Sequence, residues 1–471
     1  MSWWAPVLDA LNAQVLAYFV VLNAVYVGTT LVALASLRRY AARLRSVDMV
    51  DALTVGGTPP VTVVAPAYNE EATCVQSVRA LLTLEYAEYE VLVVNDGSKD
   101  RTLARLTEAF DLVAAPRAPT SDVGHRPVRS VYRSRTHQGL WVIDKENGGK
   151  ADALNAGLAH VRTPLFCAID VDSLVERDAL TRIVRPFLED DSTVAAGGII
   201  RIANGCTVAG GRVTRVELPG SFLARVQVVE YLRSFLSGRV GWDAMGATLI
   251  ISGAFGMFKR SLVVAAGGYD TTTVGEDMEL VVRLHRHCRR QGIPCRISFV
   301  ADPVAWTECP ETLKVLARQR ERWHRGLTEV LWRHRGMCFN PRYGRIGMLA
   351  VPYYVLLEML GPIIELAGYA AFVVTILLGR ADPRFVAAFL LLAFALGISL
   401  SLAAISLEEL AFRRYPRTRQ MLGLMLVSVL EGIGYHQLHT WWRFKGLVAA
   451  VRRRRGWGEM TRKGFGTAPI T

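Results

Sequence analysis

The sequence predicts an α/β domain, built on a mixed and mostly parallel sheet, that is fused to an α-helical membrane region. The chain has 471 residues, of which 51% are apolar and 21% are charged, and its mean hydropathy is +0.24. This composition is too apolar for a wholly soluble protein and too charged for a pure bundle of membrane helices. Short β-rich runs alternate with helical patterns from about Pro60, and long apolar stretches lie on both sides of that region.

Long stretches with few charges predict the membrane helices. Residues 12–37, 354–378 and 385–407 are each about long enough to span a bilayer. A last apolar stretch, residues 421–435, is short and contains Glu431, which favours a re-entrant or tilted segment. Arginines follow the first stretch directly, so the positive-inside rule places the N-terminus outside and the following residues inside.

The charge and the cysteines narrow the class of protein. A net charge of +13 is compatible with nucleic acid, anionic lipid or an acidic substrate. The basic residues cluster beside the apolar stretches, at 38–45, 413–419 and 452–455, which favours anchoring at a membrane. No nucleic-acid-binding motif accompanies them, so we expect no nucleic-acid partner. The seven cysteines are odd in number and scattered, which is typical of reduced, cytosol-facing residues.

Three apolar runs predict buried parallel strands whose polar ends lie at one edge of a sheet. They are residues 61–65, 90–94 and 165–169. We expect a helix between the first two, over residues 70–84. The Pro, Arg and Ser content of residues 115–138 indicates a surface insertion. Ligands of open α/β sheets gather at the carboxyl ends of the strands, so the polar residues there form the candidate site.

Asp170 and Asp172 directly follow the third predicted strand. Two carboxylates at this spacing can clamp a Mg²⁺ or Mn²⁺ ion that bridges a nucleotide diphosphate. A structural alternative is that Asp172 or Ser173 caps a helix over residues 175–188. The two interpretations are compatible with each other.

Polar residues at the other strand ends could contact a nucleotide. Tyr68 could stack on a base, and Glu70 could pair with it. Asp96 could accept a hydrogen bond from a base or ribose, or it could lie in a simple turn. In the run 147–150, two glycines allow close backbone approach and Lys150 offers a cation for a phosphate.

Glu276 and Asp277 stand just before a helical pattern that begins at Met278. As structural residues they would be favourable acids in the first turn of that helix. As chemical groups, one of the two carboxylates could deprotonate an attacking hydroxyl.

Residues 311–335 predict an amphipathic helix that lies in the plane of the membrane interface. Its apolar residues are Leu313, Leu316, Trp323, Leu327 and Val330. The run 319–323 within this helix contains an arginine, which can hold a phosphate bidentately, and a tryptophan, which can stack on a sugar. This position, between the predicted α/β domain and the membrane stretches, suggests a site that passes its product into the membrane.

Taken together, these motifs resemble those of the membrane-integrated family 2 glycosyltransferases, which include the cellulose, chitin, hyaluronan and poly-N-acetylglucosamine synthases. The resemblance covers about residues 61–442. Residues 251–258 and the tail are most similar to the poly-N-acetylglucosamine synthases. The family implies a GT-A nucleotide-sugar domain on the cytosolic face and a transmembrane channel after it. Six motifs carry the resemblance, at residues 66–70, 95–98, 149–151, 170–172, 275–277 and 319–323.

The resemblance implies a role for each candidate residue. Asp277, with Glu276 beside it, would provide the general base. One base without a carboxylate nucleophile implies inversion, so an α-linked donor would give a β-linked product. The metal, Mg²⁺ or Mn²⁺, would be bound by Asp172 and Asp170. The acceptor would be bound by Ser252, Gly253, Gln319 and Trp323. The UDP donor would be held by Tyr68, Glu70, Asp96, Lys150, Asp170 and Arg322.

The resemblance also implies an activity. We expect a hexosyltransferase that polymerises a UDP-activated sugar, with UDP-GlcNAc the best guess, into a β-linked polysaccharide and moves it across the plasma membrane. The alternatives are a cellulose-, chitin- or hyaluronan-type synthase that uses another UDP-sugar, or a non-processive transferase to a lipid acceptor. The partners would be the UDP-sugar, the growing polysaccharide and the lipid bilayer, and could include a small accessory membrane subunit.

The expected chain organisation has five parts in a multi-pass membrane protein whose catalytic domain is cytosolic. They are a membrane helix with a basic flank (1–45), a GT-A domain (46–310), interfacial helices with the run 319–323 (311–350), channel helices (351–445) and a basic cytosolic tail (446–471).

Overall fold

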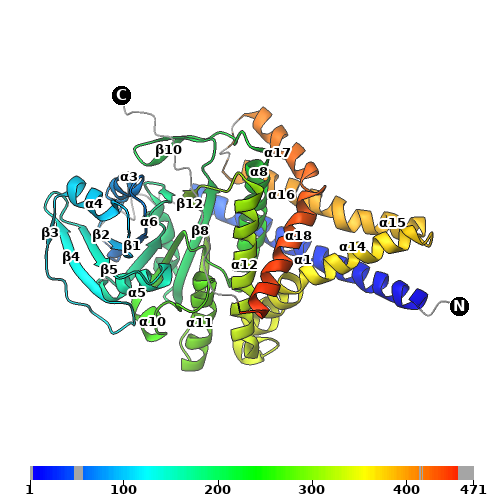
Figure 1. Ribbon diagram of the computed structural model, residues 1–471, viewed down its shortest axis with the longest axis horizontal. Coiled ribbons are helices and arrows are strands. Elements are labelled where there is room, and N and C mark those ends of the chain that lie inside the picture. The colour runs from blue at the N-terminus through cyan, green and yellow to red at the C-terminus, as the bar shows by residue number, and fades with distance from the viewer. Residues whose placement is uncertain (1–3, 47–56, 413–414, 416, 454–471) are drawn as a thin grey trace. The chain divides into compact units, whose positions relative to one another are not determined.

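The computed structural model describes residues 4–46, 57–412, 415 and 417–453 (Figure 1). They form two compact units. The sheet unit contains the described residues of Tyr40–Pro219 and Met245–Cys309. The helical unit contains those of Met1–Arg39, Gly220–Ala244 and Pro310–Met460.

A ten-stranded mixed sheet forms the centre of the sheet unit. Its strands are β1 (Val61–Ala67), β2 (Tyr89–Asn95), β3 (Leu112–Ala114), β4 (Val128–Ser134), β5 (Leu140–Lys145), β6 (Leu165–Ile169), β7 (Leu174–Val175), β8 (Thr193–Ile202), β11 (Phe255–Lys259) and β12 (Arg296–Thr307). Their order is β3-β4-β5-β2-β1-β6-β11-β8-β12-β7. A separate hairpin pairs β9 (Thr207–Ala209) with β10 (Arg212–Arg215).

The middle of this sheet is parallel. β5, β2, β1 and β6 run in one direction, and so do β8 and β12, whereas the remaining pairs are antiparallel. Ala67 at the end of β1 lies opposite Asn95 at the end of β2, so the polar residues that follow these strands share one edge. The prediction of a mixed sheet is confirmed, and the three predicted strands are β1, β2 and β6.

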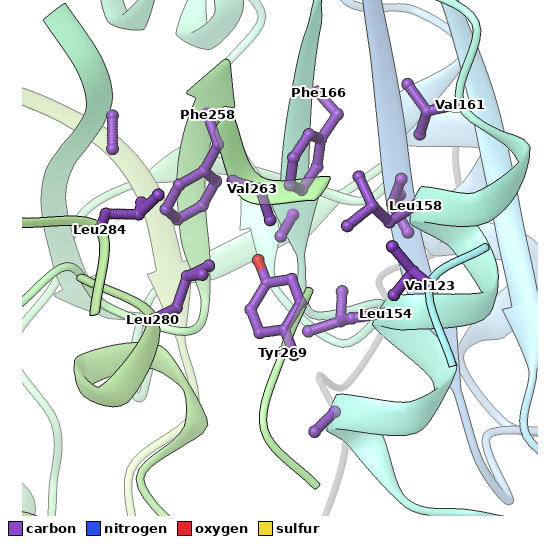
Figure 2. Close-up of a cluster of buried hydrophobic side chains, with 14 of the residues drawn as sticks. Val123, Leu154, Leu158, Val161, Phe166, Phe258, Val263, Tyr269, Leu280 and Leu284 are labelled. Carbon is purple, nitrogen blue, oxygen red and sulfur yellow. The ribbon is translucent and has the colours of Figure 1, made fainter. Parts of the chain in front are cut away.

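Helices cover the sheet and enclose its core. They are α3 (Cys74–Leu81), α4 (Thr102–Phe110), α5 (Lys150–His160), α6 (Ala179–Ile183), α7 (Arg185–Glu189), α10 (Arg260–Ala265) and α11 (Glu276–Gln291). Figure 2 shows leucines of α5 and α11 around Phe166, Phe258 and Tyr269. The rings of Phe166 and Phe258 stack with centroids 5.4 Å apart. This apolar packing fixes α5 and α11, whose first turns carry the candidate polar residues.

The helix predicted over residues 70–84 is shorter than expected. It begins at Cys74 because Glu70–Thr73 form a turn, in which the Thr73 hydroxyl donates to the Glu70 carboxylate at 2.9 Å. At the other end, the Tyr89 hydroxyl accepts a hydrogen bond from the Leu84 N–H at 3.1 Å and so holds that residue in a separate turn. Side-chain hydrogen bonds of this kind compete with helical ones at both ends.

The helix predicted over residues 175–188 is wrong. Residues 174 and 175 form strand β7, which pairs antiparallel with β12, and two short helices follow it. The second of these, α7, has Pro186 in its first turn, where the missing N–H breaks continuity with α6. No helix therefore begins at Asp172 or Ser173, which removes the capping alternative for that motif.

The expected surface insertion at residues 115–138 is wrong in part, because this segment contributes to the interior. Arg117 is 5% exposed and forms a bidentate ion pair with Glu90, at 2.6 and 3.0 Å. Its guanidinium also lies over the ring of Trp141, 4.8 Å from the ring centroid. The end of the segment is strand β4, which extends the sheet beside β5. Its polar composition therefore reflects paired charges as well as solvent exposure.

Among the described residues, three helical stretches are long and apolar enough to cross a membrane, Pro6–Tyr40, Ile346–Leu377 and Pro383–Leu410. Apart from Tyr40, they belong to the helical unit. Thr418–Leu430 and Tyr435–Val451 form a further pair bent by 63°, as a broken span or a re-entrant loop would be.

The elements of this unit are α1 (Trp4–Ser46), α8 (Phe222–Leu232), the π-helix η1 (Arg233–Arg239), α9 (Val240–Ala244), α12 (Leu313–Arg333), η2 (Arg335–Met337), η3 (Pro341–Tyr343), η4 (Ile346–Ala350), α13 (Val351–Tyr353), η5 (Tyr354–Met359), α14 (Gly361–Leu377), α15 (Pro383–Leu390), η6 (Leu391–Ala395), α16 (Leu396–Ala411), α17 (Thr418–Leu430) and α18 (Tyr435–Val451).

The helix predicted over residues 311–335 is confirmed as α12, but its five predicted apolar residues do not share one environment, since Leu316 and Val330 are buried. Leu313 and Trp323 are exposed, and the buried side carries Arg320 together with other polar residues. Arg320 is paired with Glu230 of α8 at 2.6 Å, so its charge is compensated in the interior. Helix α18 packs against α12 through Gly446, where a Cβ would lie 2.4 Å from a backbone carbonyl of α12.

Candidate functional site

The candidate site begins where β6 ends. Asp170 follows the last residue of that strand, and its N–H donates to the carbonyl of Ala254 at 3.3 Å. This contact ties the end of β6 to the loop before β11, which contains Ser252 and Gly253. The antiparallel pairing of β6 with β11 therefore delivers the predicted metal residue and the predicted acceptor residues to one place.

Helix α11 brings Asp277 to the same loop. Asp277 lies in the first turn of α11, and its Oδ2 atom accepts a hydrogen bond from the Gly253 N–H at 3.0 Å. Its Oδ1 atom accepts from the N–H of Met278 at 2.7 Å. These two hydrogen bonds stabilise the ionised carboxylate and fix its orientation. Asp277 is thus a pre-oriented carboxylate at the edge of a pocket.

Lys150 is the cation of the site. It is the first residue of α5, and its Nζ atom lies 2.5 Å from Asp170 Oδ1 and 3.8 Å from Glu276 Oε1. It also donates to the carbonyl of Gly253 at 3.0 Å. Burial by itself would lower the pKa of Lys150, but the carboxylates of Asp170 and Glu276 raise it above its usual value. Lys150 is therefore a permanent positive charge at neutral pH.

Glu276 lies deeper than Asp277 and is 5% exposed. Burial raises the pKa of Glu276 to about 7, against the opposing effect of Lys150. A carboxyl group with such a pKa can exchange a proton near neutral pH, which is a property of acid–base groups in active sites. The pocket at this position is lined, among others, by Lys150, Ser252, Gly253, Tyr269, Glu276 and Asp277.

The ends of β1 and β2 supply a second group of predicted residues. Tyr68 is 44% exposed, so its ring face is available for stacking. Glu70 is half-buried, and its N–H is bonded to the Thr102 hydroxyl at 2.8 Å. Asp96, in contrast, is 3% exposed. Its carboxylate accepts hydrogen bonds from the backbone N–H groups of the loop at residues 147–149.

Asp170 and Asp172 are the predicted ligands of a divalent cation. Both are half-buried at a strand end, so they can reach a ligand from solvent. No group of three or more His, Cys, Asp or Glu side chains among the described residues is placed to hold a metal ion. The chain would therefore supply two carboxylate oxygens and leave the other positions to phosphate and water, which is the arrangement that Mg²⁺ prefers.

The remaining predicted residues lie on α12 in the helical unit. Gln319 is 8% exposed, Arg322 is half-buried and Trp323 is 44% exposed. The guanidinium of Arg320 lies over the Trp323 ring, 4.4 Å from its centroid, and holds the ring in place.

Sequence reasoning missed two buried charges beside the site, Lys145 and Asp152. Lys145 ends β5 and Asp152 lies in the first turn of α5, and their side chains approach within 2.6 Å. A signal for Lys145 was present, because it follows the apolar run 140–143 as Asp170 follows its own apolar strand. No signal identified Asp152, whose partners come from other elements.

The comparisons with known proteins agree with this architecture. Residues 59–326 match the family described as glycosyltransferase-like family 2, and this match covers more than half of the chain. The chain belongs to glycosyltransferase family 2. The chain is similar in structure to a mannosyltransferase from Pyrobaculum calidifontis, solved with GDP-Man and Mn²⁺. The match covers 88% of this chain and 99% of the mannosyltransferase, with 18% sequence identity and a TM-score of 0.50. That likeness supports the GT-A fold.

Curated relatives point to a subgroup of family 2. The poly-β-1,6-N-acetyl-D-glucosamine synthase of Staphylococcus aureus (strain COL) is 29% identical over 274 residues, which are 58% of this chain and 56% of the relative. The synthase of the same name from Staphylococcus epidermidis is 27% identical over 267 residues, 56% of this chain and 54% of that relative. The chain thus spans about half the length of the curated relatives it matches.

The buried carboxyl of Glu276 predicts a pH-dependent effect on stability. The pKa of Glu276 is about 7 in the folded protein, against an ordinary value of 4.5. The protonated carboxyl therefore stabilises the folded state. This contribution is fully present below pH 4.5 and is lost as the pH rises through 7. Glu276→Gln stays neutral, so its Tm relative to wild type should rise between about pH 5 and about pH 8. Thermal unfolding of both proteins measures this. Glu108→Gln, which removes an exposed carboxylate, is the control, and a constant Tm difference for Glu276→Gln contradicts the prediction.

Proposed function

We propose that this chain is a processive, inverting glycosyltransferase that polymerises UDP-GlcNAc into a β-linked polysaccharide and moves the product across the membrane. The observation that carries this proposal is the hydrogen bond between Asp277 and the Gly253 N–H, because it places an oriented carboxylate next to the Lys150–Asp170 pair. A base and a cation side by side are what the transfer of a sugar from a diphosphate requires. Membership of family 2 and the poly-N-acetylglucosamine synthases among the relatives favour this donor class.

The chemical step uses Asp277 as the general base. The hydroxyl oxygen of the acceptor forms a bond to the anomeric carbon of the donor while the bond from that carbon to the UDP oxygen breaks. The hydroxyl proton moves to the carboxylate of Asp277. Attack opposite the leaving group inverts the anomeric centre, so an α-linked donor gives a β-linkage. No glycosyl-enzyme intermediate is part of this step.

The donor would be held by groups at the ends of β1 and β6 and at the start of α5. Tyr68 and Glu70 would contact the base, and Lys150 would neutralise part of the diphosphate charge beside Asp170. Asp170 and Asp172 would hold Mg²⁺ or Mn²⁺, which when bound offsets the negative charge of the diphosphate. Lys150 does not depend on that ion for its position, because Asp170 and the Gly253 carbonyl hold it in this structure.

The acceptor would be bound by Ser252 and Gly253 in the sheet unit and by Gln319 and Trp323 of α12, with Arg322 contacting the donor diphosphate. The ring of Trp323 is held by the Arg320 guanidinium and is 44% exposed, which suits stacking on a sugar.

Export is supported by the helical unit. Three helical stretches can cross a membrane, and arginine-rich segments next to them favour a cytosolic catalytic domain at the plasma membrane. Inside the unit, Glu358 and Arg443 pair at 2.9 Å, and Thr440 donates to Glu365 at 2.8 Å. Buried polar groups in membrane helices are features of a polar pathway.

Purified protein in lipid nanodiscs tests the proposal directly. UDP release and product size should be measured with UDP-GlcNAc, UDP-glucose and UDP-glucuronate side by side. The proposal expects UDP release and long polymer with UDP-GlcNAc. Polymer formed from another donor would contradict the assignment of UDP-GlcNAc as the substrate. Single-sugar products on lipid would contradict processive synthesis and indicate a non-processive transferase.

Asp277→Asn should abolish transfer and leave UDP affinity near that of wild type. The amide keeps the shape of the side chain but cannot take a proton, so the rate should fall at least about a hundredfold. Transfer assays and calorimetric UDP titration measure the two effects. Asp111→Asn, an exposed position, controls for the loss of charge. A rate close to wild type for Asp277→Asn removes this residue from the role of base.

Asp172→Ala should weaken UDP binding and abolish its dependence on the divalent metal. The loss in affinity should be at least about tenfold, because the diphosphate charge is left less compensated. UDP titrations with Mn²⁺ and with EDTA measure the change, and Asp191→Ala, at an exposed carboxylate, is the control. If EDTA leaves UDP binding and activity of the wild type unchanged, the metal assignment is wrong.

Trp323→Ala should lower polymer synthesis at least roughly tenfold while UDP binding persists, because the acceptor loses the ring on which its terminal sugar stacks. Trp332→Ala is the matched control, since Trp332 is an exposed tryptophan, 65% exposed, on the same helix. Polymer yield and length measure the effect. An equal, small loss in both variants would assign Trp323 to membrane anchoring.

A further inference from the structure

Lys145 is a buried cation that the proposed reaction does not use. It is the last residue of β5, and its side chain has no exposed surface. Its Nζ atom lies 2.6 Å from Asp96 Oδ1 and 2.6 Å from Asp152 Oδ1, and it donates to the carbonyl of Glu146 at 2.5 Å. An ammonium group has three donors, so all three are used inside the protein.

Asp96 is saturated by donors of the chain itself. Besides the contact with Lys145, its carboxylate accepts hydrogen bonds from the side chain of Asn147 at 3.2 Å and from the N–H groups of Gly148 at 3.0 Å and Gly149 at 2.8 Å. A carboxylate has about four acceptor positions. Asp96 therefore holds the backbone of the loop at residues 147–149.

Asp152 packs against the same loop at Gly148 and also pairs with Lys145. It lies in the first turn of α5 and accepts hydrogen bonds from the Arg126 N–H, at 3.1 Å to each oxygen. A Cβ at Gly148 would lie 2.4 Å from Asp152 Oδ1, so the loop passes at a distance that only glycine permits. Gly149, with φ of 88°, then turns the chain into Lys150.

We propose that Lys145 is a positioning residue for the donor site. Its ammonium group pairs with both Asp96 and Asp152. These two carboxylates fix the position of the loop before Lys150, which in turn pairs with Asp170. Without the ammonium, two buried carboxylates would face each other with no cation between them, and the loop between them would shift. This inference rests on the proposed function, because it assigns the loop to binding of a nucleotide diphosphate.

Three variants in lipid nanodiscs test the inference, with UDP and Mn²⁺ as the probe. Lys145→Met removes the cation. Lys145→Met combined with Asp152→Asn restores the net charge of the cluster. Lys259→Met removes the ammonium that donates to the carbonyl of Asp191 at 2.5 Å, at the end of β11, and is the control. Calorimetric titration gives the UDP affinity of each variant, and thermal unfolding gives its Tm.

The proposal expects Lys145→Met to bind UDP roughly tenfold more weakly than wild type at a temperature where it is folded. The double variant should recover both Tm and most of the UDP affinity, because charge balance holds the loop again. Lys259→Met should bind UDP as wild type does. An unchanged affinity in Lys145→Met overturns the inference.

Two other outcomes also overturn it. Recovery of Tm without recovery of affinity in the double variant would mean that Lys145 acts on the ligand directly and not through the loop. Failure of both variants to fold would assign Lys145 to folding alone. A wild-type protein that binds no UDP is a separate result, since it contradicts the proposed function and not the arrangement of the loop.

Discussion

The ammonium of Lys150 is the interaction on which the candidate site depends. It lies among Asp170, Glu276 and the carbonyl of Gly253, with Asp277 held on the N–H of the same glycine. Three carboxylates in one half-buried pocket repel one another and lose hydration, and a cation among them offsets both costs. The site is therefore an electrostatic unit, in which the cation keeps Asp277 and Asp170 in place together.

The position of Lys150 depends on a charge pair that lies deeper in the sheet unit. Lys150 begins α5, and the loop before it is bonded to Asp96, which in turn is paired with the fully buried Lys145. The helical unit follows the same rule, since Arg233 pairs with Glu431 at 2.5 Å and with the hydroxyl of Ser401. A fully buried charge that loses its partner costs about 3–5 kcal/mol, so the pair of Lys145 and Asp96 constrains the elements that carry it.

Much of this arrangement could be predicted from the sequence, because its signals are local. An apolar run followed by a carboxylate identified β6 and Asp170, and long stretches with few charges identified the helices that are apolar enough to cross a membrane. The hydrogen bond from Gly253 to Asp277 could not be predicted, since it joins residues that are 24 positions apart on different elements.

The errors have physical causes as well. The buried side of α12 can include the charged Arg320 because Arg320 pairs with Glu230 on another helix, and helical periodicity does not reveal such a partner. Residues 174 and 175 form a strand because β12 offers them hydrogen bonds, although their sequence also suits a helix. In both places a tertiary partner overrides local preference.

The central proposal is a single displacement at the anomeric carbon, in which the acceptor hydroxyl attacks and the oriented carboxylate of Asp277 takes its proton. The anomeric configuration of the newly formed linkage, measured by proton NMR on product made from an α-linked UDP-sugar, tests this claim most directly. A β-configuration is the result that the arrangement of Asp277 and Lys150 predicts. An α-configuration would require a second displacement by another nucleophile and would contradict the account.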